Sequence, residues 1–224
     1  MKNTIKYLIL LIIYLVCGVN LQAQNYTFRN VVMSDGLSGL LVNAIYKDSE
    51  GFVWLGTDNC LDRFDGVKVR HYEFRGVDSG RKKRVNCITE TADNQLWVGN
   101  GIGLWRLNRA NGQLERIVPE KIDFAVNTLL PDGDILYIGT EKGLFIQKDG
   151  QLLQVLTDRN MLAACNRIMD LCLNEDKSAL WLATVQGLFS YSLKDGKIDS
   201  WHFQENVPEA DYFRCLTRIG ETLY

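Results

Sequence analysis

Two arginines and two tryptophans are the side chains of this sequence best suited to holding a polar ligand. Arg63 and Arg106 each follow a leucine by two residues, and Trp105 and Trp201 lie outside the register of the other recurring aromatic residues. A guanidinium can pair with carboxylate or phosphate groups, and an indole offers an apolar face with one polar N–H group. These four residues are the candidate ligand-binding set. Salt bridging for the arginines and packing for the tryptophans are the favoured interpretations.

No arrangement in the sequence predicts catalysis, a metal site or a cofactor. His71 and His202 are the two histidines, and neither has a carboxylate or cysteine at a ligand spacing. Most Asp and Glu residues fall in turns, where local backbone hydrogen bonding explains them. A glycoside hydrolase or lyase with paired carboxylates from different parts of the chain remains the enzymatic alternative.

The cysteines indicate neither a disulfide framework nor a zinc motif. Five lie beyond the first 23 residues, an odd number without a C-x-x-C spacing: Cys60, Cys87, Cys165, Cys172 and Cys215. We expect most of them to be small buried residues, and one disulfide stays open in an oxidising compartment.

The N-terminus predicts export. Lys2 and Lys6 precede an apolar run from Tyr7 to Val16, and a cleavage site before Gln24 follows, so residues 1–23 are predicted to be a signal peptide. We therefore expect an exported protein. The chain has 27 acidic and 25 basic residues, and this balance argues against nucleic-acid binding.

One pattern recurs along residues 24–224 with a period of about 43 residues, which is typical of β-propeller blades. Its markers are an aromatic residue and, two positions later, a small one: Trp54 and Gly56, Trp97 and Gly99, Tyr137 and Gly139, Trp181 and Ala183, and finally Tyr224. We predict an all-β, incomplete propeller of four-stranded antiparallel blades, about four and a half in number. The predicted repeats span residues 40–80, 83–122, 124–163, 166–205 and 213–224.

The stretch "FVWLGT" shows why these residues should form strands. It is rich in β-branched and aromatic residues, it is apolar on both faces, and turn residues bound it. Such a strand suits burial between neighbouring blades, so the marker aromatics are expected in the core. The glycine after each marker indicates a close approach of the backbone to another element.

Residues Asp35 to Gly66 resemble the first blade of two-component regulator propeller sensors. They contain D-G-L-S, V-N-x-I, D-x-x-G-x-x-W-x-G-T and a variant of G-L-x-R-F-D-G. The resemblance implies an exported sensor, followed in the family by further blades and a membrane kinase module. It also implies an oligosaccharide ligand, control of polysaccharide-utilisation genes and a homodimer when full length. A protein-interaction scaffold is the third alternative.

Two departures from the family pattern lead to expectations of their own. Cys60 stands where the other complete repeats have Gly103, Gly143 and Gly187, so we expect either strain or a locally relaxed turn. The sequence also ends inside a fifth repeat, so we expect a fragment whose open sheet edges favour association. Tyr26 to Arg29 is predicted to supply a strand to the closing blade.

Overall fold

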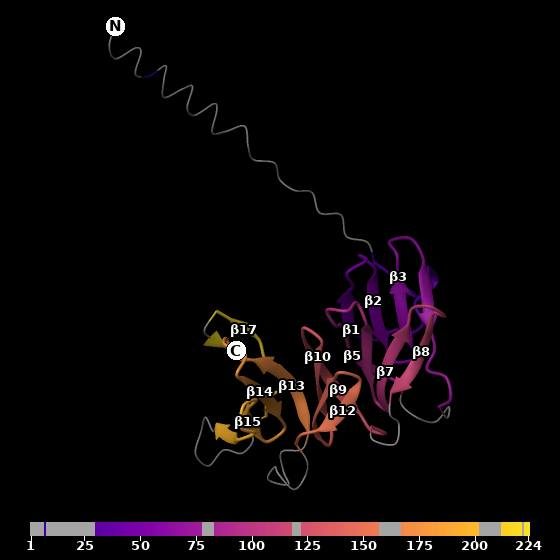
Figure 1. Cartoon of the computed structure of the whole chain (residues 1–224). Coiled ribbons are helices and arrows are strands. Elements are labelled where there is room, and N and C mark those ends of the chain that lie inside the picture. Colours follow the sequence, from indigo (N-terminus) through magenta and orange to yellow (C-terminus); the bar gives the residue numbers. More distant parts are fainter. Residues whose placement is uncertain are drawn as a thin grey trace. The chain divides into compact units, whose positions relative to one another are not determined.

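The computed structural model describes Tyr7 and residues 30–77, 83–117, 122–156, 167–201, 212–220 and 222–224. Val32 to Tyr224 form one compact unit (Figure 1). Apart from Tyr7, the predicted signal peptide lies outside the described residues, as do Tyr26 to Arg29, Cys165 and His202. Among the described residues, no helix has the length and apolar character needed to cross a membrane.

The fold consists of successive antiparallel sheets, four of them four-stranded and the last two-stranded. A short 3-10 helix, η2 (Met33–Asp35), precedes the first sheet. The first sheet holds β1 (Val42–Lys47), β2 (Val53–Thr57), β3 (Leu61–Phe64) and β4 (Val69–Tyr72). The second holds β5 (Val85–Glu90), β6 (Leu96–Asn100), β7 (Gly103–Asn108) and β8 (Gln113–Ile117).

The third sheet holds β9 (Val126–Asp132), β10 (Ile135–Thr140), β11 (Gly143–Lys148) and β12 (Gln151–Gln154). The fourth holds β13 (Ile168–Leu173), β14 (Ala179–Thr184), β15 (Gly187–Ser192) and β16 (Ile198–Trp201), and β17 (Arg218–Ile219) pairs with β18 (Thr222–Leu223). Each four-stranded sheet is a meander in chain order, so the predicted all-β blade architecture is confirmed. We call the first strand of each sheet the inner strand.

Turn chemistry sets the first hairpin of each blade. Asp48 accepts hydrogen bonds from the Phe52 backbone (2.8 Å) and from Nε1 of Trp54 (2.7 Å), which ties the turn to the marker tryptophan. In the second blade Thr91 accepts from Nε1 of Trp97 at 3.1 Å. Asn94 and Gly133 have positive φ in the equivalent turns, a conformation that Asn and Gly adopt with little steric penalty.

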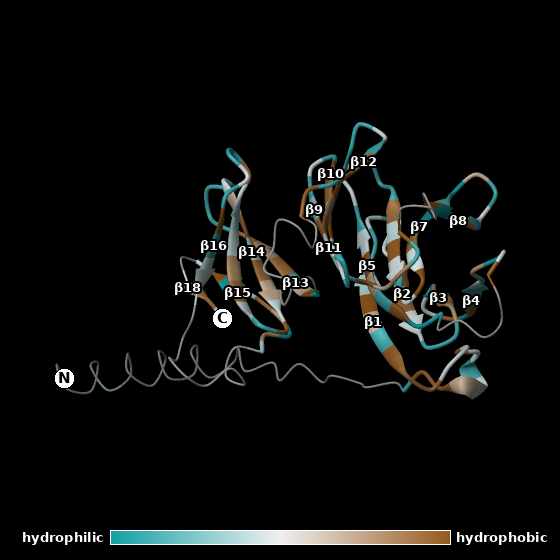
Figure 2. Ribbon diagram, turned by 90° about the horizontal axis from the view of Figure 1, so that it is seen from below, coloured by the Kyte–Doolittle hydropathy of each residue, from teal (hydrophilic) through white to brown (hydrophobic). Residues whose placement is uncertain are grey.

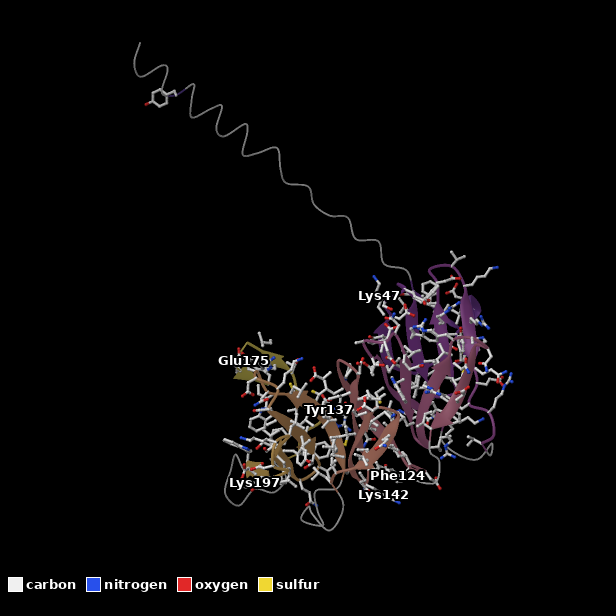
Figure 3. All side chains as sticks on the ribbon, viewed as in Figure 1. Lys47, Phe124, Tyr137, Lys142, Glu175 and Lys197 are labelled. Carbon is white, nitrogen blue, oxygen red and sulfur yellow. The ribbon has the colours of Figure 1, made fainter. Side chains whose placement is uncertain are left out.

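The hydrophobic cores lie between consecutive blades. Trp54, Phe74 and Trp105 belong to one cluster that joins the first blade to the second. Trp97 belongs to the cluster that joins the second and third blades. Tyr137, which is labelled in Figure 3, belongs to the cluster that joins the third and fourth. Figure 2 shows the apolar residues concentrated along the strands and hydrophilic residues in the connecting turns. Each blade is therefore stabilised chiefly by its neighbours.

The glycine two positions after each of the first three markers lies against the inner strand of the next blade. A Cβ added to Gly56 would lie 2.4 Å from Cγ1 of Val85, and one on Gly139 would lie 2.7 Å from Cγ2 of Ile168. Both distances are far below van der Waals contact, so the glycines permit the close approach that the pattern indicated.

The later markers are less enclosed than the earlier ones. Trp54, Trp97 and Tyr137 are buried, Trp181 is half-buried, and Tyr224 is 67% exposed. Trp181 packs against Trp201 with ring centroids 5.4 Å apart. Positive φ occurs at Gly103, Gly143 and Gly187 but not at Cys60. The turn of the first blade is therefore locally relaxed and not strained.

Polar groups also tie the blades together. Arg109 pairs with Glu90 of its own blade and Glu50 of the preceding one, at 2.7 and 2.9 Å. Asp170 accepts from Oγ1 of Thr128 at 2.9 Å and from the Leu216 backbone at 2.8 Å, and so links three consecutive blades.

Candidate functional site

A cavity of about 440 Å³ lies where the starts of successive inner strands converge. The inner strands β1, β5, β9 and β13 lie side by side, which brings their equivalent residues to this place. Residues from the β6–β7 and β10–β11 turns complete the wall. We call this the inner-strand pocket, and its lining residues are Asn43, Arg84, Asn86, Gly101, Ala125, Asn127, Glu141, Arg167, Met169 and Arg214.

The charged groups of the inner-strand pocket are mostly basic. Arg84, Arg167 and Arg214 come from three different blades, and Glu141 is the carboxylate among the lining residues. All four side chains are exposed. The Arg214 guanidinium donates to the Tyr212 hydroxyl at 3.4 Å, and this hydrogen bond and charge hold the pKa of Tyr212 below its ordinary value. The pocket therefore favours an anionic or strongly hydrogen-bonding ligand.

A row of amides forms the wall between the arginines. Nδ2 of Asn86 donates to the Val126 carbonyl at 2.9 Å, and Nδ2 of Asn127 donates to the Ile168 carbonyl at 2.8 Å. Each bond crosses from one blade to the next. The equivalent amide nitrogen of Asn43 is buried without a hydrogen-bond partner. Asn86 and Asn127 thus fix the spacing of the inner strands and hence the shape of the pocket.

The two candidate arginines lie outside the inner-strand pocket. The Arg63 guanidinium stacks on Phe52, with its carbon 4.1 Å from the ring centroid. Nε of Arg63 is buried without a partner. Arg106 pairs with Glu115 at 3.2 Å, which is the salt-bridging role favoured from the sequence.

The two candidate tryptophans differ sharply in exposure. Trp105 is 1% exposed, packs edge-on against Phe74 and donates to the Asn100 side chain at 3.1 Å, so the suggestion of an exposed stacking surface is wrong for it. Trp105 lies on β7, one strand beyond the marker strand β6, and its side chain is buried by the preceding blade. Trp201 is 49% exposed on the outermost strand of its blade.

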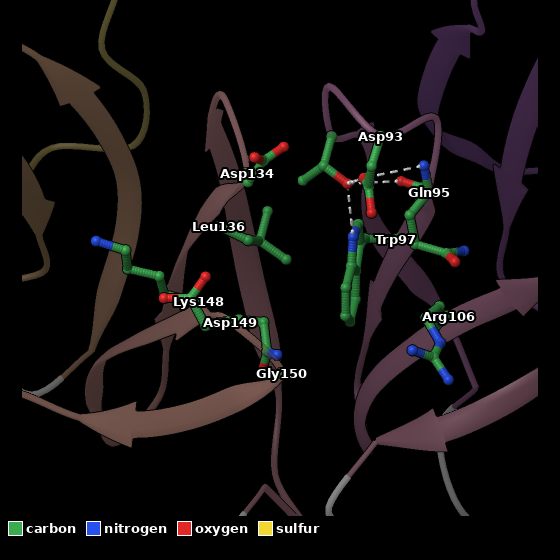
Figure 4. A pocket seen from close by; sticks show the side chains of 11 residues that line it. Asp93, Gln95, Trp97, Arg106, Asp134, Leu136, Lys148, Asp149 and Gly150 are labelled. Carbon is green, nitrogen blue, oxygen red and sulfur yellow. Dashed lines mark hydrogen bonds between the residues drawn. The ribbon is translucent and has the colours of Figure 1, made fainter.

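Arg106 also lines a second cavity of about 390 Å³ between the second and third blades. Figure 4 shows Trp97 and Leu136 facing each other across it, with Asp93 and Asp134 at the β5–β6 and β9–β10 turns. Lys148 and Asp149 belong to the opposite side. Charges of both signs line this cavity, so it selects no ligand class as clearly as the inner-strand pocket does.

His71 has acidic and cysteine neighbours in space, although neither lies at a ligand spacing in the sequence. Its Nδ1 lies 2.7 Å from Oδ1 of Asp62, and Sγ of Cys60 lies 3.3 Å from the same oxygen. Burial raises the pKa of the Cys60 thiol to about 12. The partner was missed because Asp62 and His71 lie opposite each other on β3 and β4, a pairing that depends on strand register.

Among the described cysteines, Cys60, Cys87, Cys172 and Cys215 are free thiols. Burial raises the pKa of both the Cys87 and the Cys172 thiol. Such thiols are weak nucleophiles, in keeping with the expected packing role.

Sequence reasoning also missed the pocket arginines. Arg84 and Arg167 each immediately precede the first residue of an inner strand, Val85 and Ile168. The signal that could have identified these arginines is that both occupy the same position in the repeat. Arg84 ends a basic run that begins at Arg81, and the first two residues of this run, Arg81 and Lys82, lie outside the described part of the chain.

Comparison with known proteins supports the same architecture. A model of the two-component regulator propeller family matches residues 36–59. Over 79 residues the chain is 32% identical to Histidine kinase P4 of Formosa agariphila, an alignment that covers 35% of this chain and 6% of that protein. The chain thus spans a small part of the relative's length.

Two solved structures show the breadth of the fold. One, described as the extracellular domain of a hybrid two-component system of B. thetaiotaomicron, has a TM-score of 0.64 and 24% identity, and the match covers 79% of this chain and 24% of that one. Virginiamycin B lyase of Staphylococcus aureus is more distant, with a TM-score of 0.60, 13% identity, and 88% and 65% coverage. Residues 36–59 therefore match a two-component regulator propeller repeat, and the chain has the fold of the extracellular domain of that hybrid two-component system.

Proposed function

We propose that this chain is the exported, ligand-sensing propeller region of a hybrid two-component sensor, positioned on the periplasmic side of the inner membrane. Its role is to detect oligosaccharides and thereby control polysaccharide-utilisation genes. The family match at residues 36–59 and the relation to a histidine kinase support this assignment. The partners in the full-length protein are the remaining blades, a membrane kinase module and a second copy of the sensor.

The ligand class we propose is an acidic oligosaccharide, bound in the inner-strand pocket. The observation that carries this proposal is the convergence of Arg84, Arg167 and Arg214, from three blades, on one cavity. Arginine forks pair with the carboxylates of uronic acids or with sulfate esters in two-point contacts, and the neighbouring asparagines suit sugar hydroxyls.

Signalling follows from the position of the pocket across blades. A ligand that pairs with arginines of separate blades stabilises one spacing of the inner strands, and a change in that spacing is passed to neighbouring modules. The free energy available for the switch is limited to the difference in ligand affinity between the two spacings.

Calorimetric titration with trigalacturonate tests the proposal, with maltotriose as the neutral comparison. We expect binding of the acidic trisaccharide, weaker binding at high salt, and a roughly tenfold loss of affinity, about 1.4 kcal/mol, in both Arg84→Gln and Arg167→Gln. Arg75→Gln is the matched control because Arg75 is exposed and lies outside the pocket lining.

Two results would remove the basis of the proposal. One is the absence of binding across a panel of uronate-bearing, sulfated and neutral oligosaccharides. The other is binding that the two pocket variants and the Arg75→Gln control affect equally, because the arginines would then have no specific part in it.

A further inference from the structure

The first blade carries a buried polar cluster at a place that the other blades fill with apolar side chains. By strand pairing, Asp62 corresponds to Trp105, Phe145 and Phe189, which are all buried aromatics. Cys60 corresponds to Gly103, Gly143 and Gly187. Two departures from the repeat thus lie two residues apart, and His71 faces one of them from β4.

The cluster brings together three side chains of the types that bind metal ions. Asp62 is completely buried. One ligand atom from each of Cys60, Asp62 and His71 lies within 4.8 Å of the other two. The thiol and the imidazole both approach Oδ1 of Asp62, at 3.3 and 2.7 Å, so two donors meet at one oxygen. A cation among the three would bind the same atoms in place of these two hydrogen bonds.

A second set of contacts holds the carboxylate in place. Oδ2 of Asp62 accepts hydrogen bonds from the backbone N–H and the hydroxyl of Ser38, both at 2.8 Å. Metal-ligating carboxylates are commonly oriented in this way by groups behind them. Oδ1 remains directed toward the cysteine and the histidine.

The cluster is also accessible. A cavity of about 380 Å³ is bordered by Cys60 and His71 together with Ser38, Asn59 and Lys83. The His71 side chain is 47% exposed, so an ion can reach it from solvent. Burying a carboxylate is costly for a fold unless a partner compensates the charge. The other blades have aromatic residues at the position of Asp62, so the blade architecture does not require a carboxylate there.

We propose that Cys60, Asp62 and His71 bind one divalent transition-metal ion, with zinc the best fit. Sulfur, nitrogen and oxygen ligands in a three-residue set match zinc, and a fourth position facing the cavity would take water or a ligand group. Binding converts the Cys60 thiol to a thiolate and releases its proton to solvent. The imidazole coordinates through Nδ1 and carries its proton on Nε2, and no electron is transferred.

Cobalt titration of the EDTA-treated chain tests the site. Co²⁺ bound to a thiolate gives a near-ultraviolet charge-transfer band and visible bands that report a low coordination number. We expect these bands to saturate at one ion per chain and to be displaced by Zn²⁺. Cys60→Gly, which restores the residue of the other repeats, should abolish the charge-transfer band and lower affinity at least about 100-fold, since losing a ligand exceeds the usual effect of losing an outer contact.

His71→Gln, on a half-exposed strand position, tests the site without altering the buried turn, and it should also weaken binding. Cys215→Ser is the control because it removes an exposed thiol elsewhere and should leave the bands unchanged. No charge-transfer band in the wild-type chain, or a band that persists in Cys60→Gly, would overturn the proposal. A band that disappears only in Cys215→Ser would do so as well.

Discussion

A Cβ added to Gly99 would lie 2.6 Å from Cγ1 of Val126, the first residue of the next inner strand. The same relationship joins Gly56 to Val85 and Gly139 to Ile168. The recurring glycine is therefore the place where one blade packs against the inner strand of the next. This contact brings the starts of the inner strands together, and the inner-strand pocket lies where these starts converge.

Gly99→Ala should destabilise the fold by about 1–3 kcal/mol, because the added methyl overpacks the junction between two blades. Gly133→Ala is the matched control. Gly133 has a positive φ, but its added Cβ would meet nothing within 4 Å, so only a backbone cost of about 1 kcal/mol applies. Urea unfolding of the chain measures both. Equal losses, or a larger loss in the control, would contradict the close-approach explanation.

Trp105→Ala should be far more damaging than Trp201→Ala. Trp105 is buried against Phe74 between two blades, so its removal leaves a cavity that costs about 3–5 kcal/mol. Trp201 is half-exposed on an outermost strand, and its loss should cost less than half as much. Thermal unfolding of the two variants gives the comparison, and a similar drop in Tm for both would show that the assigned burial is wrong.

Asp65→Asn should lower stability near neutral pH and have less effect in acid. Oδ1 of Asp65 accepts from the Lys68 and Val67 backbone N–H groups at 2.7 and 2.9 Å, and these bonds lower its pKa from the ordinary value of 3.8. A folded-state pKa below the unfolded one contributes stability above pH 3.8, and this is lost as the pH falls through the folded value.

Melting curves between about pH 6 and pH 2.5 measure this difference, because the range spans both forms of the carboxyl group. The deficit of Asp65→Asn relative to wild type should shrink as the pH falls. A deficit that stays constant or grows in acid would mean that the carboxylate charge has no part in holding the turn.

Cys87 should resist alkylation while Cys215 reacts. Burial raises the pKa of the Cys87 thiol, and the residue is half-buried, so its thiolate population is low. Cys215 is exposed. Iodoacetamide treatment at mildly alkaline pH, followed by peptide mapping, should label Cys215 first and should label Cys87 more slowly in the folded chain than after denaturation. Equal labelling in the folded chain would contradict the burial.

The repeat made the blades predictable, because Trp54, Trp97 and Tyr137 mark the same strand in each and the turn residues bound it. Their burial follows from the apolar character of that strand. Trp105 was harder, since its environment depends on packing against Phe74, which belongs to the preceding blade. Local patterns do not carry such contacts.

Neither the inner-strand pocket nor the cluster of Cys60, Asp62 and His71 was predicted from the sequence, and the two reasons are related. Asp62 and His71 are nine residues apart and meet only through the register of β3 with β4. Arg84 and Arg167 are remote in sequence and converge because the inner strands lie side by side. Aligning the repeats on the first residue of each inner strand would have shown the arginines as equivalent.

The central claim is that an acidic oligosaccharide occupies the inner-strand pocket, and hydrogen–deuterium exchange with trigalacturonate locates the ligand most directly. Saturating ligand should slow exchange in peptides that contain the starts of β5, β9 and β13, and leave the outermost strands β8 and β16 unchanged. Protection confined to the outermost strands, or to the turns around the cavity lined by Trp97 and Arg106, would place the ligand elsewhere and contradict the claim.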